Sequence, residues 1–360
     1  MSFENKKLEE FNNYIRYRKV AIIGLGVSNI PLIDYMYEKK AKVTVFDERE
    51  IDSIPKEILG KIKKYDFKFY FGKNSLENLN DFDIIFRSPS CLPTKPELEA
   101  ESLRGAIVTS EIELLMKMAP CKIIGVTGRD GKTTTTSLIN HILEKSGKTT
   151  FLGGNIGTPL FTKLSKMTPE DIVVLELSSF QLMGMEISPD IAVITNISPN
   201  HLNIHKDYQE YIDAKKNIFR YQNEKNTLIL NYDNEITRKC SNEAKGNVIF
   251  FSSKEKLDNG FIVDDKIIKQ CKDQIREHIL NTDEEYMKKI RDKVSRIVNF
   301  EDKGTGAAYA DAVINALYSQ GKLQNEYSGF EYFFIRDEFL TVKPKEFSKE
   351  VKNIKDLGIV

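Results

Sequence analysis

The stretch GVTGRDGKTTTT, residues 125–136, decides the fold of the region around it. The apolar run CKIIGV leads into it and is typical of a short buried strand, whereas TSLINHILEK after it repeats apolar residues at helical spacing. A glycine-rich turn between strand and helix suits a phosphate-binding loop, because the first backbone N–H groups of a helix have no internal partner and attract anions. The sequence therefore predicts a strand, a phosphate loop and a helix in succession.

Each residue type in this loop has a role in phosphate binding. Glycines let the backbone wrap closely, Lys132 would reach the β- and γ-phosphates, and Thr133 would offer its hydroxyl to Mg²⁺. Val126 stands where the longer form of the motif has its first glycine, so the loop is the shorter T-G-x-x-G-K-T-T. An ordinary turn is the alternative, but Gly-Lys-Thr after a buried strand is hard to obtain by chance. The predicted phosphate-binding residues are Gly128, Asp130, Gly131, Lys132, Thr133 and Thr134.

Composition limits the possible partners. The 360 residues are enough for two or three domains, and 53 basic residues balance 53 acidic ones, so no basic field favours nucleic acid. The charged start lacks the apolar region of a signal peptide, and no apolar run approaches a membrane span. Cys91, Cys121, Cys240 and Cys271 are scattered without a CxxC pair, which favours reduced thiols over disulfides or zinc. We expect a cytoplasmic protein, monomeric, with no nucleic-acid partner and no membrane insertion.

Residues 1–118 predict a small Rossmann-like α/β domain. Strands are expected at KVAIIGLG, AKVTVFD, FKFYFG and FDIIFRSPS, and a helix at SNIPLIDYMYEKK. The turn GLGVSN keeps Gly24 and Gly26 of the dinucleotide fingerprint but has Asn29 in place of the third glycine, and Asp47 closes the second strand. A nicotinamide site, a site for another nucleotide and a plain tight turn all remain open from this motif.

Residues 119–280 predict a second α/β domain with a parallel sheet. DIVVLELSSFQL, DIAVITNISPNHLNIH and NTLILNYDNE are apolar strands that end in polar residues, and such ends share one edge of the sheet with the phosphate loop. Glu176 and His201 follow two of these strands and are candidate ligands of a divalent cation, Glu176 being the better one for a hard ion. The alternatives are a helix cap or an ion-pair partner for Glu176 and a surface residue for His201. On the helix YIDAKKNIF, one of Lys215 and Lys216 could face inward with the apolar residues while the other is solvated, but the segment itself favours two solvated lysines.

Residues 281–360 do not continue the alternation of apolar strands and helices that is expected of the two preceding domains. TDEEYMKKIRDKVSRIV and GAAYADAVINALYSQGK predict helices and YFFIRDEFLTVKP one or two strands, which gives a short α+β region without a site motif.

The motifs GLGVSNIPL, RSPS, GVTGRDGKTTTT, GGNIGTPL, VLELSSFQL, TNISPNHL, YIDAKKNIF and LNYDNE stand in the order of the Mur ligase family, which residues 18–250 resemble. The resemblance is closest to members that add D-glutamate to UDP-N-acetylmuramoyl-L-alanine in peptidoglycan precursor synthesis. It implies an ATP-dependent amide-bond ligase in which ATP phosphorylates the alanyl carboxylate and the amine of D-glutamate then attacks the acyl phosphate.

The resemblance also implies roles for individual residues. Lys132, Glu176, His201 and Lys215 would be catalytic. One Mg²⁺ would lie near Thr133 and Glu176, and a second would be held by Glu176, His201 and a carbamylated Lys215. The nucleotide substrate would contact Gly26, Val27, Ser28, Asp47, Ser88, Asn155 and Ser178, and the base and ribose of ATP would contact Asn231 and Asp233.

Several positions depart from the family pattern. Asn200 and Asn203 flank His201 where acidic residues are common, Arg129 replaces a small hydroxyl residue, and the third-domain motifs are not found after residue 280. Two hypotheses follow: a D-glutamate-adding ligase with a divergent or truncated C-terminal region, and a catalytically impaired relative that only binds UDP-sugar, ATP or both. The phosphate loop argues against a nicotinamide-dependent oxidoreductase.

Overall fold

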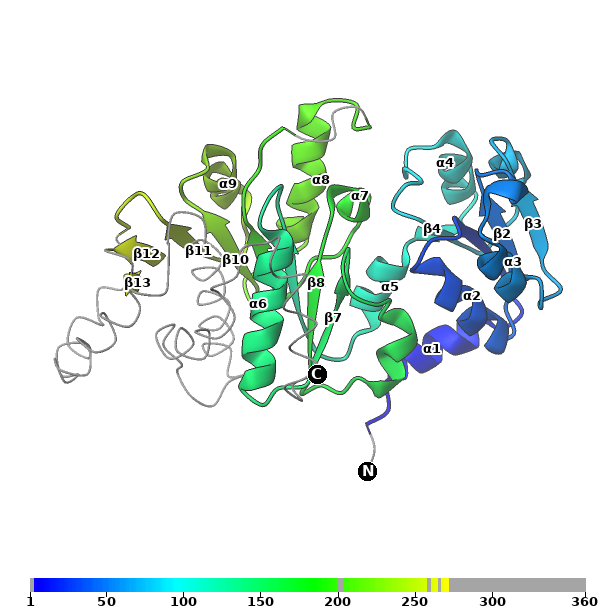
Figure 1. The fold of residues 1–360 in the computed structure, drawn as a ribbon, viewed down its shortest axis with the longest axis horizontal. Helices are drawn as coiled ribbons and strands as arrows, with labels where there is room; N and C mark the ends of the chain where they lie inside the picture. Colours follow the sequence, from blue (N-terminus) through cyan, green and yellow to red (C-terminus); the bar gives the residue numbers. More distant parts are fainter. Residues whose placement is uncertain (1–2, 200–203, 258–259, 265–266, 272–360) are drawn as a thin grey trace. The chain divides into compact units, whose positions relative to one another are not determined.

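The computed structural model of the protein describes residues 3–199, 204–257, 260–264 and 267–271 (Figure 1). The chain divides into two compact units, of which the first comprises Met1–Leu230 and Asn234–Val248 and the second Asn231–Asp233 and Ile249–Val360. The helices and strands expected within residues 281–360 lie outside the described residues. The domain boundaries at 118 and 280 remain predictions.

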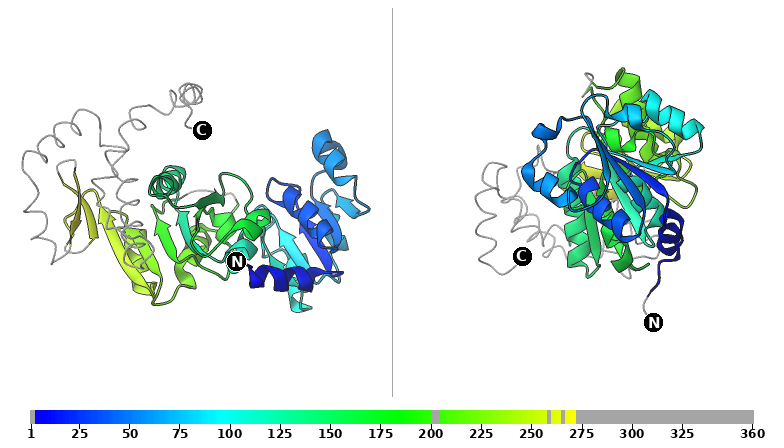
Figure 2. Two further views of the ribbon diagram at one scale, coloured as in Figure 1. Left: turned by 90° about the horizontal axis from the view of Figure 1, so that it is seen from below. Right: turned by 90° about the vertical axis from the view of Figure 1, so that its right-hand side faces the viewer.

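The first sheet has five parallel strands in the order β3-β2-β1-β4-β5. Helices flank both faces, as Figure 2 shows. The strands are β1 (Lys19–Ile23), β2 (Lys42–Asp47), β3 (Lys68–Phe71), β4 (Ile84–Arg87) and β5 (Ile107–Thr109). The helices are α1 (Lys6–Ile15), α2 (Asn29–Glu38), α3 (Lys56–Ile62), α4 (Pro96–Leu103) and α5 (Glu111–Met118), with short 3₁₀ turns at Ile51–Ser53 and Ser75–Asn78.

This strand order confirms the Rossmann-like prediction. The chain turns in opposite directions from β1 and from β4, so the turn after β1 and the segment after β4 meet at the carboxyl ends of neighbouring strands. The strands are apolar runs because both faces are covered, and a cluster around Ile23, Phe46 and Ile85 forms the core on one side.

The second sheet of the first unit contains five parallel strands in the order β10-β9-β6-β8-β7. Its strands are β6 (Lys122–Thr127), β7 (Thr150–Gly154), β8 (Ile172–Glu176), β9 (Ile191–Ile194) and β10 (Thr227–Asn231). The helices are α6 (Lys132–Lys145), α7 (Ser179–Leu182), α8 (Tyr208–Arg220) and α9 (Glu235–Cys240), with 3₁₀ turns at Phe161–Lys166 and Ser241–Glu243. The predicted parallel sheet and the helix after the phosphate loop are confirmed.

Three further strands are β11 (Asn247–Ser252), β12 (Gly260–Asp264) and β13 (Ile267–Cys271). β11 pairs in parallel with β12, and β12 pairs with β13 in an antiparallel hairpin.

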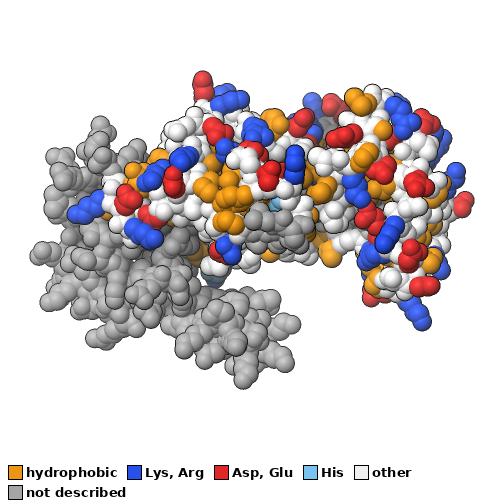
Figure 3. Space-filling model, turned by 90° about the horizontal axis from the view of Figure 1, so that it is seen from above, with side chains coloured by type: hydrophobic (Ala, Val, Ile, Leu, Met, Phe, Trp, Pro, Cys, Tyr) orange, Lys and Arg blue, Asp and Glu red, His pale blue; other side chains and the backbone are white. Residues whose placement is uncertain are grey.

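Charges of both signs are interspersed over the face of the molecule drawn in Figure 3. Among the described residues, no helix combines the length and apolarity needed to cross a membrane. Cys91, Cys121 and Cys240 are buried free thiols.

Candidate functional site

The phosphate loop joins β6 to α6 as the sequence predicts. Gly131 caps α6 with φ +77° and Gly128 has φ +150°, conformations that L side chains rarely adopt. A Cβ on Gly128 would also lie 1.8 Å from Thr195 Oγ1, so this position has no room for a side chain. Lys132 is the first residue of α6, and its Nζ donates to Arg129 O at 2.6 Å. Thr134 is exposed on the first turn of the same helix.

Asn196, which follows β9, holds this loop in place. Its Oδ1 accepts from the backbone N–H groups of Arg129 (3.1 Å) and Asp130 (3.0 Å), and its Nδ2 donates to Asp130 O at 3.1 Å. The neighbouring Thr195 donates its hydroxyl to the same carbonyl at 2.7 Å. The guanidinium of Arg129 donates to Ser198 Oγ at 3.1 Å. Sequence reasoning did not single out Thr195 or Asn196, although both lie in the quoted motif TNISPNHL.

Glu176 ends β8, is buried, and lies beside two other predicted residues. Its Oε2 accepts from Thr133 Oγ1 at 2.7 Å and its Oε1 from Asn155 Nδ2 at 2.9 Å. Asn155 follows β7, and its backbone N–H donates to Glu176 O at 2.8 Å. The edge of the sheet thus places the Glu176 carboxylate beside the Thr133 hydroxyl, and both are oxygen-bearing groups of the kind that a hard cation prefers. Among the described residues, no cluster of three or more His, Cys, Asp or Glu side chains could hold a metal ion.

Ser178 lies two residues after Glu176 and caps α7. Its hydroxyl accepts from Gln181 N at 3.2 Å, and Gln181 Oε1 accepts from Ser178 N at 2.9 Å, which forms a reciprocal capping box. The Ser178 side chain therefore has a structural partner in addition to its predicted contact with substrate.

Lys215 on α8 is buried, so the interpretation of two solvated lysines is wrong for this residue. Its Nζ donates to Gly128 O at 2.8 Å and lies 4.8 Å from the centre of the Tyr211 ring. Burial, and then the charge of Lys132, lower the pKa of Lys215 from its ordinary value of 10.5 to about 7. Lys216 points away and pairs with Glu243 at 2.6 Å. The Lys215 amine is therefore partly neutral near pH 7 and contacts the backbone of the phosphate loop at Gly128.

We expect this buried amine to shape the pH dependence of stability. Between pH 7 and 10.5 the unfolded chain binds more protons at Lys215 than the folded chain, so the unfolding free energy rises with pH. Below about pH 7 both states are protonated and this contribution to the slope disappears. Lys215→Met should flatten the rise by up to about 1.4 kcal/mol per pH unit in urea unfolding carried out in CO₂-free buffers. Lys216→Met is the matched control and should keep the wild-type slope; an unchanged slope in Lys215→Met would contradict the assignment.

The predicted metal ligand His201 and its neighbours Asn200 and Asn203 lie outside the described residues. A second histidine, His205, follows them and is buried. Its Nε2 lies 3.0 Å from Ser179 Oγ, its Nδ1 lies 3.3 Å from Glu210 Oε2, and its ring stacks on Phe180. Sequence reasoning missed His205, because a histidine that packs against a distant helix leaves no local pattern.

In the first domain, Asp47 is buried at the end of β2 and organises the turn after β1. Its Oδ2 accepts from Leu25 N at 2.8 Å and from Arg49 Nη2 at 2.7 Å. Although burial opposes ionisation, the hydrogen bonds from Arg49 and the backbone hold the pKa of this carboxyl below its usual range. Asn29 replaces the third glycine of the fingerprint and donates to Ile23 O and Gly24 O, both at 2.9 Å.

The other predicted substrate residues lie close to this turn. Gly26, Val27 and Ser28 connect β1 to α2, and Val27 is 75% exposed. Ser88 follows β4, and a Cβ on Gly24 would lie 2.8 Å from its Oγ. The turn and the segment after β4 are therefore in direct contact.

Asn231 and Asp233 belong to the second unit. Asn231 Oδ1 accepts from Asp233 N at 2.9 Å. Asp233 in turn accepts from Ser253 N at 2.8 Å and from the hydroxyl of Ser252. Both predicted nucleotide contacts are thus part of a turn held by hydrogen bonds.

A parallel sheet with a phosphate loop, preceded by a Rossmann-like domain, defines a P-loop nucleotide-binding α/β protein. Residues 18–110 match the model of the Mur ligase MurD-like N-terminal domain, and residues 126–270 match that of the Mur ligase middle domain. The chain belongs to the Mur ligase family.

Curated relatives support this membership. The chain is 49% identical over 255 residues, 71% of its length, to a UDP-N-acetylmuramoylalanine--D-glutamate ligase of Clostridium kluyveri. It is 47% identical over 264 residues, 73% of its length, to the protein of the same name in Acetivibrio thermocellus. In both cases the match spans 56% of the relative's own length.

A solved structure shares the fold. The UDP-N-acetylmuramate:L-alanyl-gamma-D-glutamyl-meso-diaminopimelate ligase of Neisseria meningitides superposes with a TM-score of 0.51 at 15% identity, covering 90% of this chain and 98% of that one. At this identity the likeness concerns the fold alone.

Proposed function

We propose that the protein is an ATP-dependent ligase that adds D-glutamate to UDP-N-acetylmuramoyl-L-alanine. The observation that carries the proposal is the grouping of Thr133, Asn155 and Glu176 at the sheet edge, beside the loop that bears Lys132. The identity of 49% and 47% to relatives named for this reaction supports the choice of substrates. Because the match spans 56% of the length of these relatives, the experiment below tests the complete reaction. We also propose that the protein acts in the cytoplasm as a monomer.

Of the groups proposed to hold a divalent cation, the Glu176 carboxylate and the Thr133 hydroxyl lie side by side at the sheet edge. Glu176 is a buried carboxylate whose oxygens point to a hydroxyl and an amide rather than to a basic side chain. Thr133 and Glu176 would hold one Mg²⁺, and Glu176, His201 and Lys215 a second. Mg²⁺ bound there would neutralise charge that develops on the transferring phosphoryl group.

Lys215 can join such a site only after it loses its positive charge. The neutral amine would attack CO₂ through its nitrogen lone pair, form an N–C bond and release one proton, which leaves an anionic carbamate. The depressed pKa of Lys215 supplies the neutral amine near pH 7. A carbamate presents oxygen ligands where the amine presents only donors, so the modification resolves the mismatch between a lysine and a cation.

The chain's own residues would act in two steps. In the first, the alanyl carboxylate attacks the γ-phosphorus of ATP and ADP leaves, while Lys132 and the N-terminal amides of α6 stabilise the charge on the phosphoryl oxygens. In the second, the neutral amine of D-glutamate attacks the acyl carbon and phosphate departs with the electron pair of the broken C–O bond. The nitrogen loses one proton, which passes to the departing phosphate. Asn155 and Ser178 would position the acceptor, the turn at Gly26–Ser28 with Asp47 and Ser88 would bind its UDP end, and Asn231 and Asp233 would contact the base and ribose of ATP.

The first experiment combines the protein with ATP, Mg²⁺, UDP-N-acetylmuramoyl-L-alanine and D-glutamate, and detects the ligated product by mass. We expect product and free phosphate in equal amounts, with no phosphate release when the acceptor is left out. Saturable nucleotide binding without product would instead assign the protein to the binding-only alternative. Phosphate release without the acceptor would count against the ligase.

A further inference from the structure

Arg87, the last residue of β4, has its guanidinium buried among backbone carbonyls of two different domains. Nη1 donates to Cys91 O at 3.3 Å and to Phe180 O at 3.4 Å, and Nη2 donates to Met183 O. Only 4% of the residue is exposed. Burial removes water from the guanidinium and lowers its pKa. The hydrogen bonds to three neutral carbonyls offset part of the free energy that this desolvation costs.

Two of these acceptors belong to α7, the single helical turn that follows Glu176 and Ser178: Phe180 is its second residue and Met183 is its C-cap. The last carbonyls of a helix have no internal partner and need donors from elsewhere. Arg87 supplies them for Phe180 and Met183, and Asn217 Nδ2 donates to Leu182 O at 2.9 Å. At the other end of α7, His205 contacts Ser179. Hydrogen bonds from other segments thus hold both ends of α7, and Arg87 is the residue of the first domain that donates them.

On its other side, the segment that begins at Arg87 contacts the nucleotide turn. Ser88 N donates to Ile23 O at 3.0 Å, and Ser88 Oγ occupies the space beside Gly24. Further along this segment, Pro93 lies 3.1 Å from where a Cβ on Gly184 would stand, just after α7. One short segment thus contacts both the turn after β1 and the helix after Glu176.

We propose that Arg87 is a positioning residue that couples the nucleotide turn of the first domain to the catalytic edge of the second sheet through α7. A ligand bound at the turn after β1 would hold the segment after β4 in one position. Through its hydrogen bonds to Phe180 O and Met183 O, Arg87 would then hold α7 in a matching position. Because α7 directly follows Glu176 and Ser178, its position would determine where these two side chains lie. This inference rests on the proposed function for the identity of the two ligands. Arginine suits the task because its planar fork reaches several acceptors at once, whereas a lysine offers one point charge.

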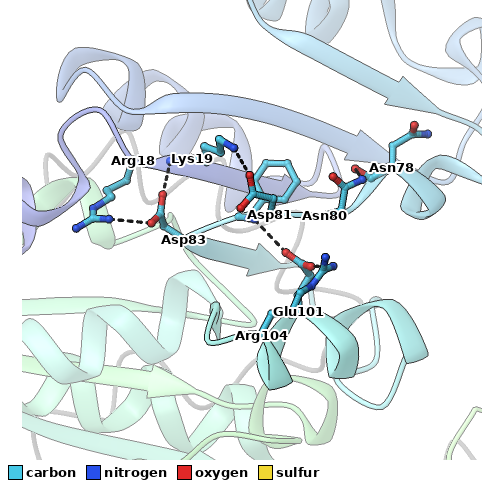
Figure 4. Close-up of polar contacts among 9 residues, drawn as sticks. Arg18, Lys19, Asn78, Asn80, Asp81, Asp83, Glu101 and Arg104 are labelled. Atoms are coloured by element: carbon cyan, nitrogen blue, oxygen red, sulfur yellow. Dashed lines mark hydrogen bonds and ion pairs between the residues drawn. The ribbon is translucent and has the colours of Figure 1, made fainter.

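The test compares Arg87→Lys and Arg87→Met with Arg18→Met. Arg18 lies in the same domain, but its side chain is half exposed and its Nη1 donates to Asp83 Oδ1 at 3.0 Å (Figure 4). The affinity for UDP-N-acetylmuramoyl-L-alanine is measured by calorimetry with and without a non-hydrolysable ATP analogue and Mg²⁺. We expect the analogue to tighten acceptor binding at least about fivefold in the wild type and in Arg18→Met. In the Arg87 variants this factor should fall toward one, while the affinity for the analogue alone stays within about twofold.

Hydrogen exchange provides a readout that needs no ligand. Amides of residues 179–183 should exchange at least about tenfold faster in Arg87→Lys than in the wild type, and at the wild-type rate in Arg18→Met, at equal melting temperatures. Wild-type coupling or wild-type exchange in Arg87→Lys would overturn the inference, and so would an equal loss of both affinities. If Arg87→Met does not fold, Arg87→Lys decides. Failure of the wild type to bind the acceptor would count against the proposed function, and the exchange rates would still show whether Arg87 holds α7.

Discussion

Lys132→Ala should lower the rate of product formation by about 10²- to 10³-fold while the protein stays folded. Lys132 begins α6, where its charge adds to the unpaired N–H groups of the helix, and its Nζ already lies along the loop at Arg129 O. Its loss would remove the cation that stabilises the transferring phosphoryl group and leave no substitute on the first turn. The rate is measured as phosphate release at saturating ATP and acceptor.

Lys145→Ala is the matched control, because Lys145 is the exposed last residue of the same helix. We expect its rate to stay within about twofold of the wild type. A second signature distinguishes local chemistry from misfolding. Lys132 contributes to the low pKa of Lys215, so Lys132→Ala should move the pH at which Lys215 titrates upward. Activity within tenfold of the wild type in Lys132→Ala would refute the catalytic role.

The second large effect is expected from Gly154→Ala, at the end of β7. Gly154 has φ +95°, and a Cβ there would lie 2.1 Å from Glu176 O and 3.1 Å from Glu176 N. These are backbone atoms of the neighbouring strand, which cannot turn aside as a side chain can. The left-handed backbone and the clash together should cost at least about 3 kcal/mol of unfolding free energy. Chemical denaturation gives the loss directly.

Gly147→Ala separates the two causes. Gly147 has φ +81°, but a Cβ there would meet nothing within 4 Å, so only the backbone term of about 1–2 kcal/mol applies. Because Gly154 stands opposite Glu176 in the β7–β8 register, any protein that survives Gly154→Ala should also lose activity as Glu176 moves from Thr133 and Asn155. Equal losses of stability in both variants would show that the steric argument is wrong.

The fold could be predicted from the sequence wherever one local pattern sufficed. Apolar runs with polar ends gave the parallel strands, and the glycines at 128 and 131 located the phosphate loop, because both signals depend only on neighbouring residues. Parallel topology then placed Glu176 beside the loop. Asn29, which replaces the third glycine of the fingerprint, also acts on residues near it in the sequence, because its Nδ2 donates to Ile23 O and Gly24 O.

What the sequence did not predict depends on contacts between distant segments. Lys215 and Lys216 are adjacent and chemically identical, and only the packing of α8 decides that the first is buried under Gly128. Asn196 reaches the phosphate loop and Arg87 reaches α7 across many intervening residues. No periodicity marks such residues, because each acts through a single side chain aimed at the backbone of another element.

The hydrogen bonds of Asn196 also affect how much a bound nucleotide gains from the loop. Fixing the backbone of one residue costs roughly 1–2 kcal/mol of conformational entropy. A loop that becomes ordered only when the ligand binds has a binding free energy that is less favourable by this amount. Here the amides of Arg129 and Asp130 are already fixed by the side chain of Asn196, and Thr195 holds the Asp130 carbonyl. This part of the entropy is lost when the chain folds, so a phosphate that arrives meets a preorganised loop and keeps more of its interaction energy as affinity.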